Sequence, residues 1–453
     1  MSARLHTTSE ERSERAILLS LATPDRTAVE VQDSLKELSE LATTAGADVV
    51  EALIQQRGAP DPSCFIGKGK ATELSLLGKD LRCDLVIVDD ELAPTQRRNL
   101  EEALGMRVID RTELILDIFA QRARTYEGKL QVELAQLTYR LPRLSGSGTE
   151  LSRLGGGIGT RGPGETKLET DRRRIRKRIS ELKRSLEDLR KQRKVQRQLR
   201  DRSNLPIVAL CGYTNAGKSS LLDLLVRIDA VGVERFLNMK PAERSNAVAQ
   251  VAGSGLLIED RLFATLDPTT RRISLPGGQE FLVSDTVGFI QRIPHDLIAA
   301  FRATLEEIKE ADLLLHVIDA SDDQVYAKIE EGVKTLSEIG ADEIPVIRVM
   351  NKIDLVSENE RRRFARDEDA VLVSTVTTEN IDSLLRRIAR SFDERRVRAS
   401  FLIPYDSGNV ENAIRTRGRV ESVEYRENGV CIVARVGRDV LNRYSDYIAA
   451  REG

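Results

Sequence analysis

The 453-residue sequence has no tryptophan, and aromatic residues make up only 4% of it. A platform of aromatic rings that stacks single-stranded bases is therefore not expected. The four cysteines form no CxxC pair and there are three histidines, so neither a disulfide framework nor a zinc site is indicated. No apolar run reaches the roughly 18 residues of a membrane-spanning helix. The N-terminal segment is polar and lacks the apolar core of a secretory signal, so we expect a cytoplasmic protein with no integral membrane segment.

Charge is distributed unevenly along the chain. Charged residues make up 31% of the sequence, yet the net charge is −2. Residues 167–202 hold 16 Lys or Arg and 6 Asp or Glu, a local charge of +10, which leaves about −12 for the remainder. Such a cationic segment can be a solvated face or a surface that binds a polyanion. Composition leaves both possibilities open.

The pattern of the first half predicts two units. Up to about residue 125, short apolar runs alternate with helical patterns, which indicates a small parallel sheet flanked by helices. The runs are 16–20, 48–53, 85–88 and 107–109, and the helical patterns are 30–43, 70–77 and 94–104. Residues 126–204 predict a projecting hairpin. It consists of a helix over 129–141 ended by Pro142, a glycine-rich loop over 145–164, and a charged helix from Glu165 to about Arg202.

The second half predicts two further α/β units. Residues 205–396 are expected to form a doubly wound domain, in which helices such as 218–226 and 296–309 separate the strands. The expected strands are 207–210, 281–284, 313–318, 346–349 and 371–373. Residues 397–453 predict a small α+β domain with the order strand, helix, strand, strand, helix and a turn at 426–429.

A phosphate-binding loop is predicted between the strand 207–210 and the helix 218–226. Residues 212–219, GYTNAGKS, fit the pattern GxxxxGK[ST]. In such a loop backbone N–H groups close around phosphates, Lys218 supplies a cation to the β and γ phosphates, and Ser219 ligates Mg²⁺. The flanking strand and helix disfavour the alternative, a simple glycine-rich turn. The predicted phosphate-site residues are Gly212, Tyr213, Thr214, Asn215, Ala216, Gly217, Lys218, Ser219 and Ser220.

The pattern NKxD at 351–354 predicts selection of guanine over adenine. It follows the strand 346–349, and the Asp354 carboxylate can accept hydrogen bonds from guanine N1–H and the N2 amino group, a donor pair that adenine lacks. Outside this context, NKxD is more often a helix cap or a surface turn. A backbone N–H after the next strand can meet guanine O6. The predicted base-site residues are Asn351, Lys352, Ile353, Asp354, Ser374, Thr375 and Val376.

Two segments are predicted to sense the γ-phosphate. In DxxG at 285–288, Asp285 holds Mg²⁺ through water and the Gly288 N–H meets the γ-phosphate. In FATLD at 263–267, Thr265 completes Mg²⁺ coordination as the second direct ligand beside Ser219; threonines in loops are common, but the order of the motifs supports this assignment. The predicted sensor residues are Phe263, Ala264, Thr265, Leu266, Asp267, Asp285, Thr286, Val287 and Gly288. The residues expected to support hydrolysis are Lys218, Thr265, Asp285, Gly288 and Asn215.

Taken together, the segments GYTNAGKS, LFATLDPTTR, DTVGFI and NKID resemble the HflX family of GTPases, within the Obg-HflX group of translation-associated GTPases. Outside the GTPase domain, the segments 65–70, 88–92, 108–112, 128–137 and 155–166 resemble the family's N-terminal signatures. The resemblance implies GTP hydrolysis with Mg²⁺ and binding to the large ribosomal subunit. It also implies that the hairpin reaches rRNA, and that stalled or idle ribosomes are split under stress. We expect a monomer, in which the cationic helix neutralises rRNA phosphates.

Three features depart from common GTPase patterns. Phe289 follows DxxG where Ras-like proteins have the glutamine that orients water, so intrinsic hydrolysis should be slow and assisted from elsewhere. The segment 231–255 makes the stretch before Thr265 long for this family. Thr375 stands where alanine is common. Asn215 can hold K⁺ beside the β and γ phosphates, or it can merely stiffen the loop.

Two other functions compete with a ribosome-splitting GTPase. One is a GTP-regulated rRNA-binding assembly or hibernation factor that splits nothing. The other, a P-loop small-molecule kinase, is disfavoured by NKID and by the lack of an acceptor-binding signature. An ATP-dependent RNA-unwinding activity of the N-terminal region stays open, and no Walker A pattern lies there.

Overall fold

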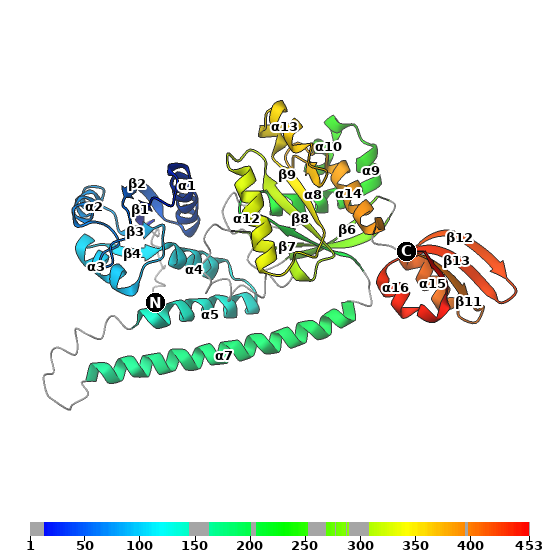
Figure 1. Ribbon diagram of the computed structural model, residues 1–453, viewed down its shortest axis with the longest axis horizontal. Coiled ribbons are helices and arrows are strands. Elements are labelled where there is room, and N and C mark those ends of the chain that lie inside the picture. The colour runs from blue at the N-terminus through cyan, green and yellow to red at the C-terminus, as the bar shows by residue number, and fades with distance from the viewer. Residues whose placement is uncertain are drawn as a thin grey trace, which may run out of the picture.

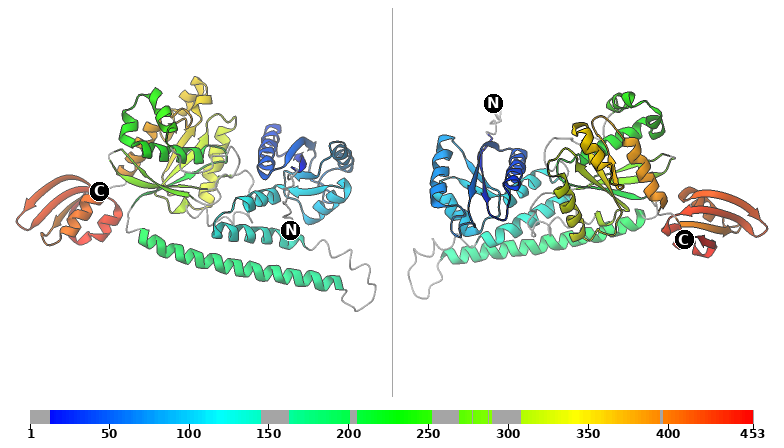
Figure 2. Two further views of the ribbon diagram at one scale, coloured as in Figure 1. Left: turned by 180° about the vertical axis from the view of Figure 1, so that it is seen from behind. Right: turned by 45° about the horizontal axis from the view of Figure 1, so that its top comes forward.

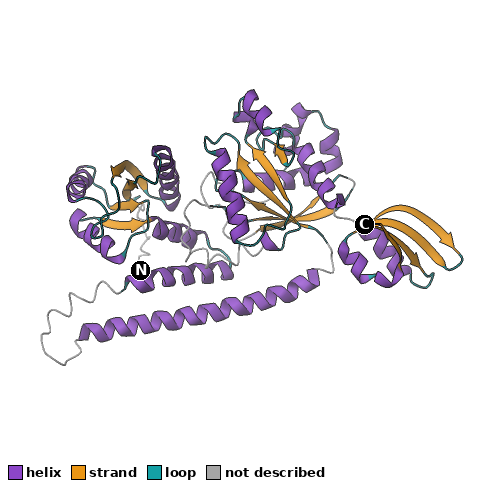
Figure 3. Ribbon diagram, viewed as in Figure 1, coloured by secondary structure: helices purple, strands orange, loops and turns teal. Residues whose placement is uncertain are grey.

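The computed structural model describes residues 13–144, 163–200, 205–251, 269–276, 278–286, 288–289, 308–394 and 397–452. It contains three separate sheets, of four, six and four strands, with helices around them (Figures 1 and 3). No helix in these ranges is long and apolar enough to cross a membrane. The multidomain α/β architecture expected from the sequence is present.

The N-terminal sheet is parallel throughout and has the order β2-β1-β3-β4. Its strands are β1 (Arg15–Ala22), β2 (Asp48–Gln56), β3 (Leu85–Val88) and β4 (Arg107–Asp110). Helices α1 (Ala28–Ala45) and α4 (Arg111–Arg122) cover one face, and α2 (Lys68–Asp80) and α3 (Pro94–Leu104) cover the other. The four expected strands and three expected helices are confirmed. The sequence had not predicted α4.

Two helices follow and lie side by side in antiparallel directions in all views, α5 (Tyr126–Arg143) and α7 (Pro163–Arg200) (Figures 1 and 2). An apolar seam joins them, formed by Leu130, Leu134, Leu137, Leu182, Leu186 and Leu189. Beside this seam, Arg178 pairs with Glu133 through two contacts of 2.7 and 2.8 Å. The expectation that Pro142 ends the first helix was wrong. Pro142 lies inside the last turn, where its missing N–H removes one helical hydrogen bond, and the helix ends one residue later.

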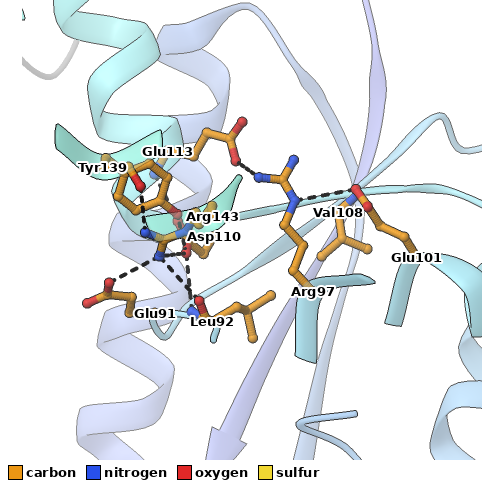
Figure 4. A network of polar contacts seen from close by, with 9 residues as sticks. All are labelled: Glu91, Leu92, Arg97, Glu101, Val108, Asp110, Glu113, Tyr139 and Arg143. Carbon is orange, nitrogen blue, oxygen red and sulfur yellow. Dashed lines mark hydrogen bonds and ion pairs between the residues drawn. The ribbon is translucent and has the colours of Figure 1, made fainter. Parts of the chain in front are cut away.

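A polar network anchors the end of α5 on the N-terminal sheet (Figure 4). Tyr139 donates a hydrogen bond to the buried carboxylate of Asp110, and the Arg143 guanidinium lies 3.4 Å from the centroid of the Tyr139 ring. Arg143 also donates to Glu91 and to the Leu92 carbonyl at 3.1 and 3.2 Å. Burial and the neighbouring Asp110 carboxylate raise the pKa of Tyr139, so the hydroxyl remains a donor.

The central sheet has the order β10-β9-β8-β5-β7-β6, in which only the edge strand β6 is antiparallel. Its strands are β5 (Ile207–Cys211), β6 (Thr269–Ser274), β7 (Glu280–Asp285), β8 (Leu313–Asp319), β9 (Val346–Asn351) and β10 (Ala370–Leu372). Helices α8 (Lys218–Val231) and α14 (Ile381–Glu394) pack on one face, and α12 (Val325–Glu338) packs on the other (Figure 3). A short helix, α13 (Glu358–Phe364), precedes β10. The five expected strands are confirmed, β6 was not predicted, and most of the expected helix 296–309 lies outside the described residues.

The long segment after α8 contains two short helices, α9 (Val233–Asn238) and α10 (Pro241–Ala249). Phe236 of α9 is fully buried in the core shared by α8 and α14. Arg244 of α10 lies over the Phe236 ring and forms an ion pair with Asp382 of α14 at 3.3 Å. The segment is thus part of the folded domain as far as residue 251.

The C-terminal sheet is antiparallel with the order β12-β13-β11-β14. Its elements are β11 (Val397–Ile403), α15 (Gly408–Arg417), β12 (Arg419–Arg426), β13 (Gly429–Val436), α16 (Arg438–Arg443) and β14 (Ile448–Glu452). The hairpin turn expected at 426–429 is present, and β14 adds a strand that was not predicted. The boundaries assigned to the four units stay predictions.

Candidate functional site

The loop between β5 and α8 adopts a conformation that requires glycine at two positions. Gly212 has φ +132°, and a Cβ there would lie 2.1 Å from the Val317 carbonyl oxygen. Gly217 has φ +94°, and its Cβ would lie 2.2 Å from Asn351 Nδ2. Both contacts are far too short for any side chain, so the loop is pressed against β8 and β9. Asn215 at the tip has φ 63° and is exposed. The loop ends at the N-terminus of α8, where backbone N–H groups are available to an anion.

Lys218 and Ser219, the first two residues of α8, meet Asp285 at the end of β7. Lys218 is buried, and its Nζ donates hydrogen bonds to the carbonyls of Gly212 and Tyr213 at 3.0 and 2.6 Å. Burial lowers the pKa of Lys218 to about 8, while the Asp285 carboxylate acts in the opposite direction. Ser219 Oγ donates to Asp285 Oδ2 at 2.7 Å. Two hard oxygen donors therefore lie together beside a cation, a set suited to Mg²⁺ and phosphate.

The DxxG segment is joined to the loop by backbone hydrogen bonds. Phe289 N–H donates to Gly212 O at 2.9 Å, and Thr214 N–H donates to Phe289 O at 3.0 Å. Between Asp285 and Phe289, a Cβ on Gly288 would lie 2.8 Å from Lys218 Nζ. Thr286 is buried, and its hydroxyl donates to Leu210 O at 2.6 Å. The two motifs, which the sequence places more than 60 residues apart, form one unit.

The ring of Phe289 points into the core. Phe289 is 3% exposed, and its ring centroid lies 6.1 Å from that of Tyr213 and 6.2 Å from that of His316. A buried ring in this position offers no polar group to a water molecule. The sequence had singled out Phe289 for its inability to orient water, but nothing in the sequence indicated His316 as its neighbour.

The NKxD segment links the phosphate loop to the loop after β10. Asn351 is fully buried; its Nδ2 donates to Ala216 O at 2.9 Å, and its Oδ1 accepts from Thr375 N–H at 3.2 Å. Lys352 has φ 62° and forms an ion pair with Asp319 at 2.6 Å. Asp319, at the end of β8, was not among the predicted residues. Ile353 is buried and Asp354 is exposed.

The loop after β10 completes the edge of the site. Ser374 is fully buried, and its hydroxyl accepts from Thr377 N–H at 3.1 Å. Val376 is 73% exposed and does not belong to the core. The structure thus brings residues 212–219, 285, 288 and 351–354 and the 374–376 loop to the carboxyl edge of one sheet. The predicted residues Phe263, Ala264, Thr265, Leu266, Asp267 and Val287 lie outside the described residues.

This arrangement defines a class of protein. A largely parallel sheet with a phosphate loop after β5, DxxG after β7 and NKxD after β9 is the arrangement of a guanine-nucleotide-binding P-loop GTPase domain.

Comparison with known proteins gives the family. Family models described as "GTP-binding GTPase N-terminal", "GTP-binding GTPase Middle Region" and "50S ribosome-binding GTPase" match residues 32–120, 122–200 and 244–352. A protein named GTPase HflX from Caldanaerobacter subterraneus is 47% identical over 96% of this chain and 94% of its own length. The GTPase HflX of Escherichia coli is 42% identical over 88% of each chain. The chain therefore belongs to the HflX family of GTPases, and it is an enzyme that hydrolyses GTP.

A solved structure, a GTP-binding protein from the archaeon Sulfolobus solfataricus in complex with GDP, is 21% identical and has a TM-score of 0.45. It covers 83% of this chain and 98% of its own. A likeness of that extent carries no argument for this chain. Guanine nucleotide as the ligand follows from the family membership instead.

Proposed function

We propose that this GTPase uses Mg²⁺ and the residues at the carboxyl edge of the central sheet to hydrolyse GTP, and that it acts on the large ribosomal subunit through the α5–α7 hairpin. In this proposal it splits stalled or idle ribosomes under stress. It works in the cytoplasm as a monomer.

The phosphate end of the proposed site uses groups that already lie together. Lys218 would exchange its two carbonyl partners for phosphate oxygens, whose negative charge favours the protonated form of its buried amine. Ser219 would hold Mg²⁺ with Asp285 one water molecule away, and Thr265, which lies outside the described residues, would be the second direct ligand. The bound Mg²⁺ would neutralise charge on the phosphate oxygens. The absence of a side chain at Gly288 leaves room for its N–H to meet the γ-phosphate beside Lys218.

The base end of the proposed site is fixed through Asn351. Because Asn351 bonds to Ala216 and to Thr375, it sets the spacing between the phosphate loop and the base loop. The carboxylate of Asp354 is exposed and so remains accessible to the guanine N1–H and N2 groups. A backbone N–H in the 374–376 loop would meet guanine O6.

Asn215 is proposed to hold K⁺ next to the β and γ phosphates. Its side chain is exposed and makes no hydrogen bond within the described part of the chain, so it is available to a cation. Its left-handed backbone also suits asparagine, which is the competing reason for its presence. K⁺ would supply the transition-state charge that an arginine finger provides elsewhere.

The observation that carries the ribosomal part of the proposal is the outer face of α7. Five exposed cations, Arg173, Arg176, Lys177, Lys183 and Arg184, form no ion pair with any described residue. At 3.6 residues per turn they fall within an arc of about 120°, opposite the leucine seam that faces α5. An unpaired cationic stripe on a long exposed helix is suited to a row of rRNA phosphates.

Neutralising Arg173, Lys177 and Arg184 together to glutamine tests this surface. Binding to isolated large subunits should weaken, and the slope of log affinity against log salt should fall by about 2 to 3, one counterion per lost phosphate contact. The matched control neutralises Arg362, Arg386 and Arg390, which are exposed on the central domain. It removes the same charge from another surface and should leave the slope unchanged. Equal slopes for the two triple variants would show that the stripe is only a solvated face.

Light scattering of intact ribosomes tests the splitting step. Mixing with the protein and GTP should lower the scattered intensity as subunits separate. Subunit binding without this fall would instead identify a GTP-regulated assembly or hibernation factor.

A further inference from the structure

The core beneath the phosphate loop contains a histidine that forms no hydrogen bond with the described residues. His316 lies in the middle of β8, with its side chain on the face covered by α12, and is 1% exposed. The helix comes so close that a Cβ on Gly332 would lie 2.6 Å from His316 Cε1 and 2.7 Å from Nε2. The ring of Phe289 is also a neighbour, with the two ring centroids 6.2 Å apart. Most other buried neighbours on this face, such as Leu314 and Leu336, are apolar.

Both ring nitrogens of His316 are buried and have no hydrogen-bond partner within the described part of the chain. Burial first, and then the charges of Arg348 and Lys218, lower the pKa of His316 to about 4. The neutral ring therefore carries one donor and one acceptor, neither of which has a partner among the described residues. An apolar residue of similar size would fill the same space without the penalty of two desolvated, unpaired nitrogens. Stability of this arrangement alone gives no reason for a histidine.

The His316 ring contacts Phe289, the residue that joins the DxxG segment to the phosphate loop. Phe289 is held to Gly212 and Thr214 by two backbone hydrogen bonds, and the preceding Gly288 faces Lys218. The DxxG segment of a GTPase moves when the γ-phosphate arrives and leaves. Any shift of Phe289 changes what His316 faces, because the two rings are in contact.

We propose that His316 is a positioning residue for GTP hydrolysis, acting through Phe289. In the arrangement described here, its ring supports Phe289 against the phosphate loop. When the DxxG segment moves with the γ-phosphate, one ring nitrogen gains a hydrogen bond, and this bond stabilises the hydrolysis-competent position of Gly288. The inference rests on GTP hydrolysis at this site and not on the ribosomal role.

The experiment compares His316→Leu, His316→Gln and the control Leu336→Val in the full chain without ribosomes. Leu336 belongs to the same apolar cluster as Phe289, and its side chain has no ring and no polar group. Steady-state hydrolysis gives kcat and KM, equilibrium binding gives the GDP affinity, and urea unfolding followed by circular dichroism gives stability. His316→Leu should unfold at the same or a higher urea concentration, bind GDP within about twofold of wild type, and lose about fivefold in kcat, the effect of one hydrogen bond. Leu336→Val should lose stability but keep kcat.

The glutamine variant keeps the proposal testable if the leucine variant does not fold. Glutamine retains a donor and an acceptor, so His316→Gln should keep more than half of the wild-type kcat. Wild-type kcat in His316→Leu would overturn the inference. Equal losses of kcat in His316→Leu and Leu336→Val would also overturn it. A folded His316→Gln that hydrolyses GTP as slowly as His316→Leu would do the same. If the wild-type protein showed no GTPase activity, the proposed hydrolysis site itself would be refuted, and the role of His316 would not be the cause.

Discussion

Replacing Asn351 by alanine tests whether the nucleotide site is held together by one side chain. The substitution removes the donor to Ala216 O and the acceptor of Thr375 N–H, at 2.9 and 3.2 Å. Both backbone groups lose their partner in a place where Asn351 itself is 0% exposed. Each buried group left unpaired costs about 1–3 kcal/mol, so the local loss for the two groups should be about 2–6 kcal/mol. The phosphate loop and the base loop should then separate more easily.

Hydrogen exchange and nucleotide binding measure this loss. Peptides that cover β5 and α8 should exchange faster in Asn351→Ala by the factor that corresponds to about 2 kcal/mol or more. Affinity for a fluorescent GDP analogue should fall at least about tenfold. The matched control is Asn246→Ala in α10, because that side chain is exposed. It should change neither quantity.

Binding of GDP within about twofold of wild type, with unchanged exchange in β5 and α8, would refute the reasoning. In that case the two hydrogen bonds would be replaceable by water, and the spacing of the loops would be set by the strands alone. Faster exchange confined to the C-terminal sheet would count against it in the same way, because no described contact of Asn351 reaches that sheet.

Three other predictions concern single side chains. Asp354→Asn should shift preference from GTP towards XTP in competition binding, because the amide offers a donor where guanine also has one; retained discrimination would remove Asp354 as the base reader. Wild-type hydrolysis should slow when Na⁺ replaces K⁺ at constant ionic strength, with GTP binding unaffected, and Asn215→Ala should abolish the difference; equal rates in both salts would exclude the cation. Since the folded pKa of His316 is about 4 and the unfolded value 6.5, the unfolded chain binds more protons between these values. The stability of the central domain should therefore fall as pH drops through this window, more steeply in wild type than in His316→Leu; parallel pH profiles would show that His316 is not buried as a neutral ring.

The motifs of the site were predictable because each is a short local pattern next to a strong strand signal. The phosphate loop directly follows Ile207–Cys211, and NKxD lies at the end of Val346–Asn351, so strand and motif identify each other. The contact between Asn351 and Ala216 was not predictable, since 135 residues separate them and no periodicity connects the two positions. The lack of a described hydrogen-bond partner for His316 was not predictable either, because only packing decides which polar atoms find a partner.

The elements that the sequence did not predict have weak or shared local signals. Strand β6 has a single fully buried residue, Ile273, and so lacks the alternation of a half-buried strand. Helix α4 begins directly after β4 without a loop; Asp110 ends the strand and also caps the helix by accepting from Glu113 N–H at 2.9 Å. A boundary that consists of one residue leaves no turn signal to detect. The edge strand β14 is five residues long and follows a short helical turn.

The attachment of the α5–α7 hairpin to the N-terminal sheet determines how far its free end can move. The leucine seam contacts α7 between Leu182 and Leu189, and α5 is itself fixed to the N-terminal sheet through Tyr139 and Arg143. From Leu182 to Pro163 the helix extends about 29 Å, at 1.5 Å per residue. A rotation of about 10° at the seam would therefore displace the Pro163 end by about 5 Å. Among the described residues, the direction of the hairpin is therefore set by the leucine seam, by the Arg178–Glu133 ion pair, and by Tyr139 and Arg143, which anchor α5.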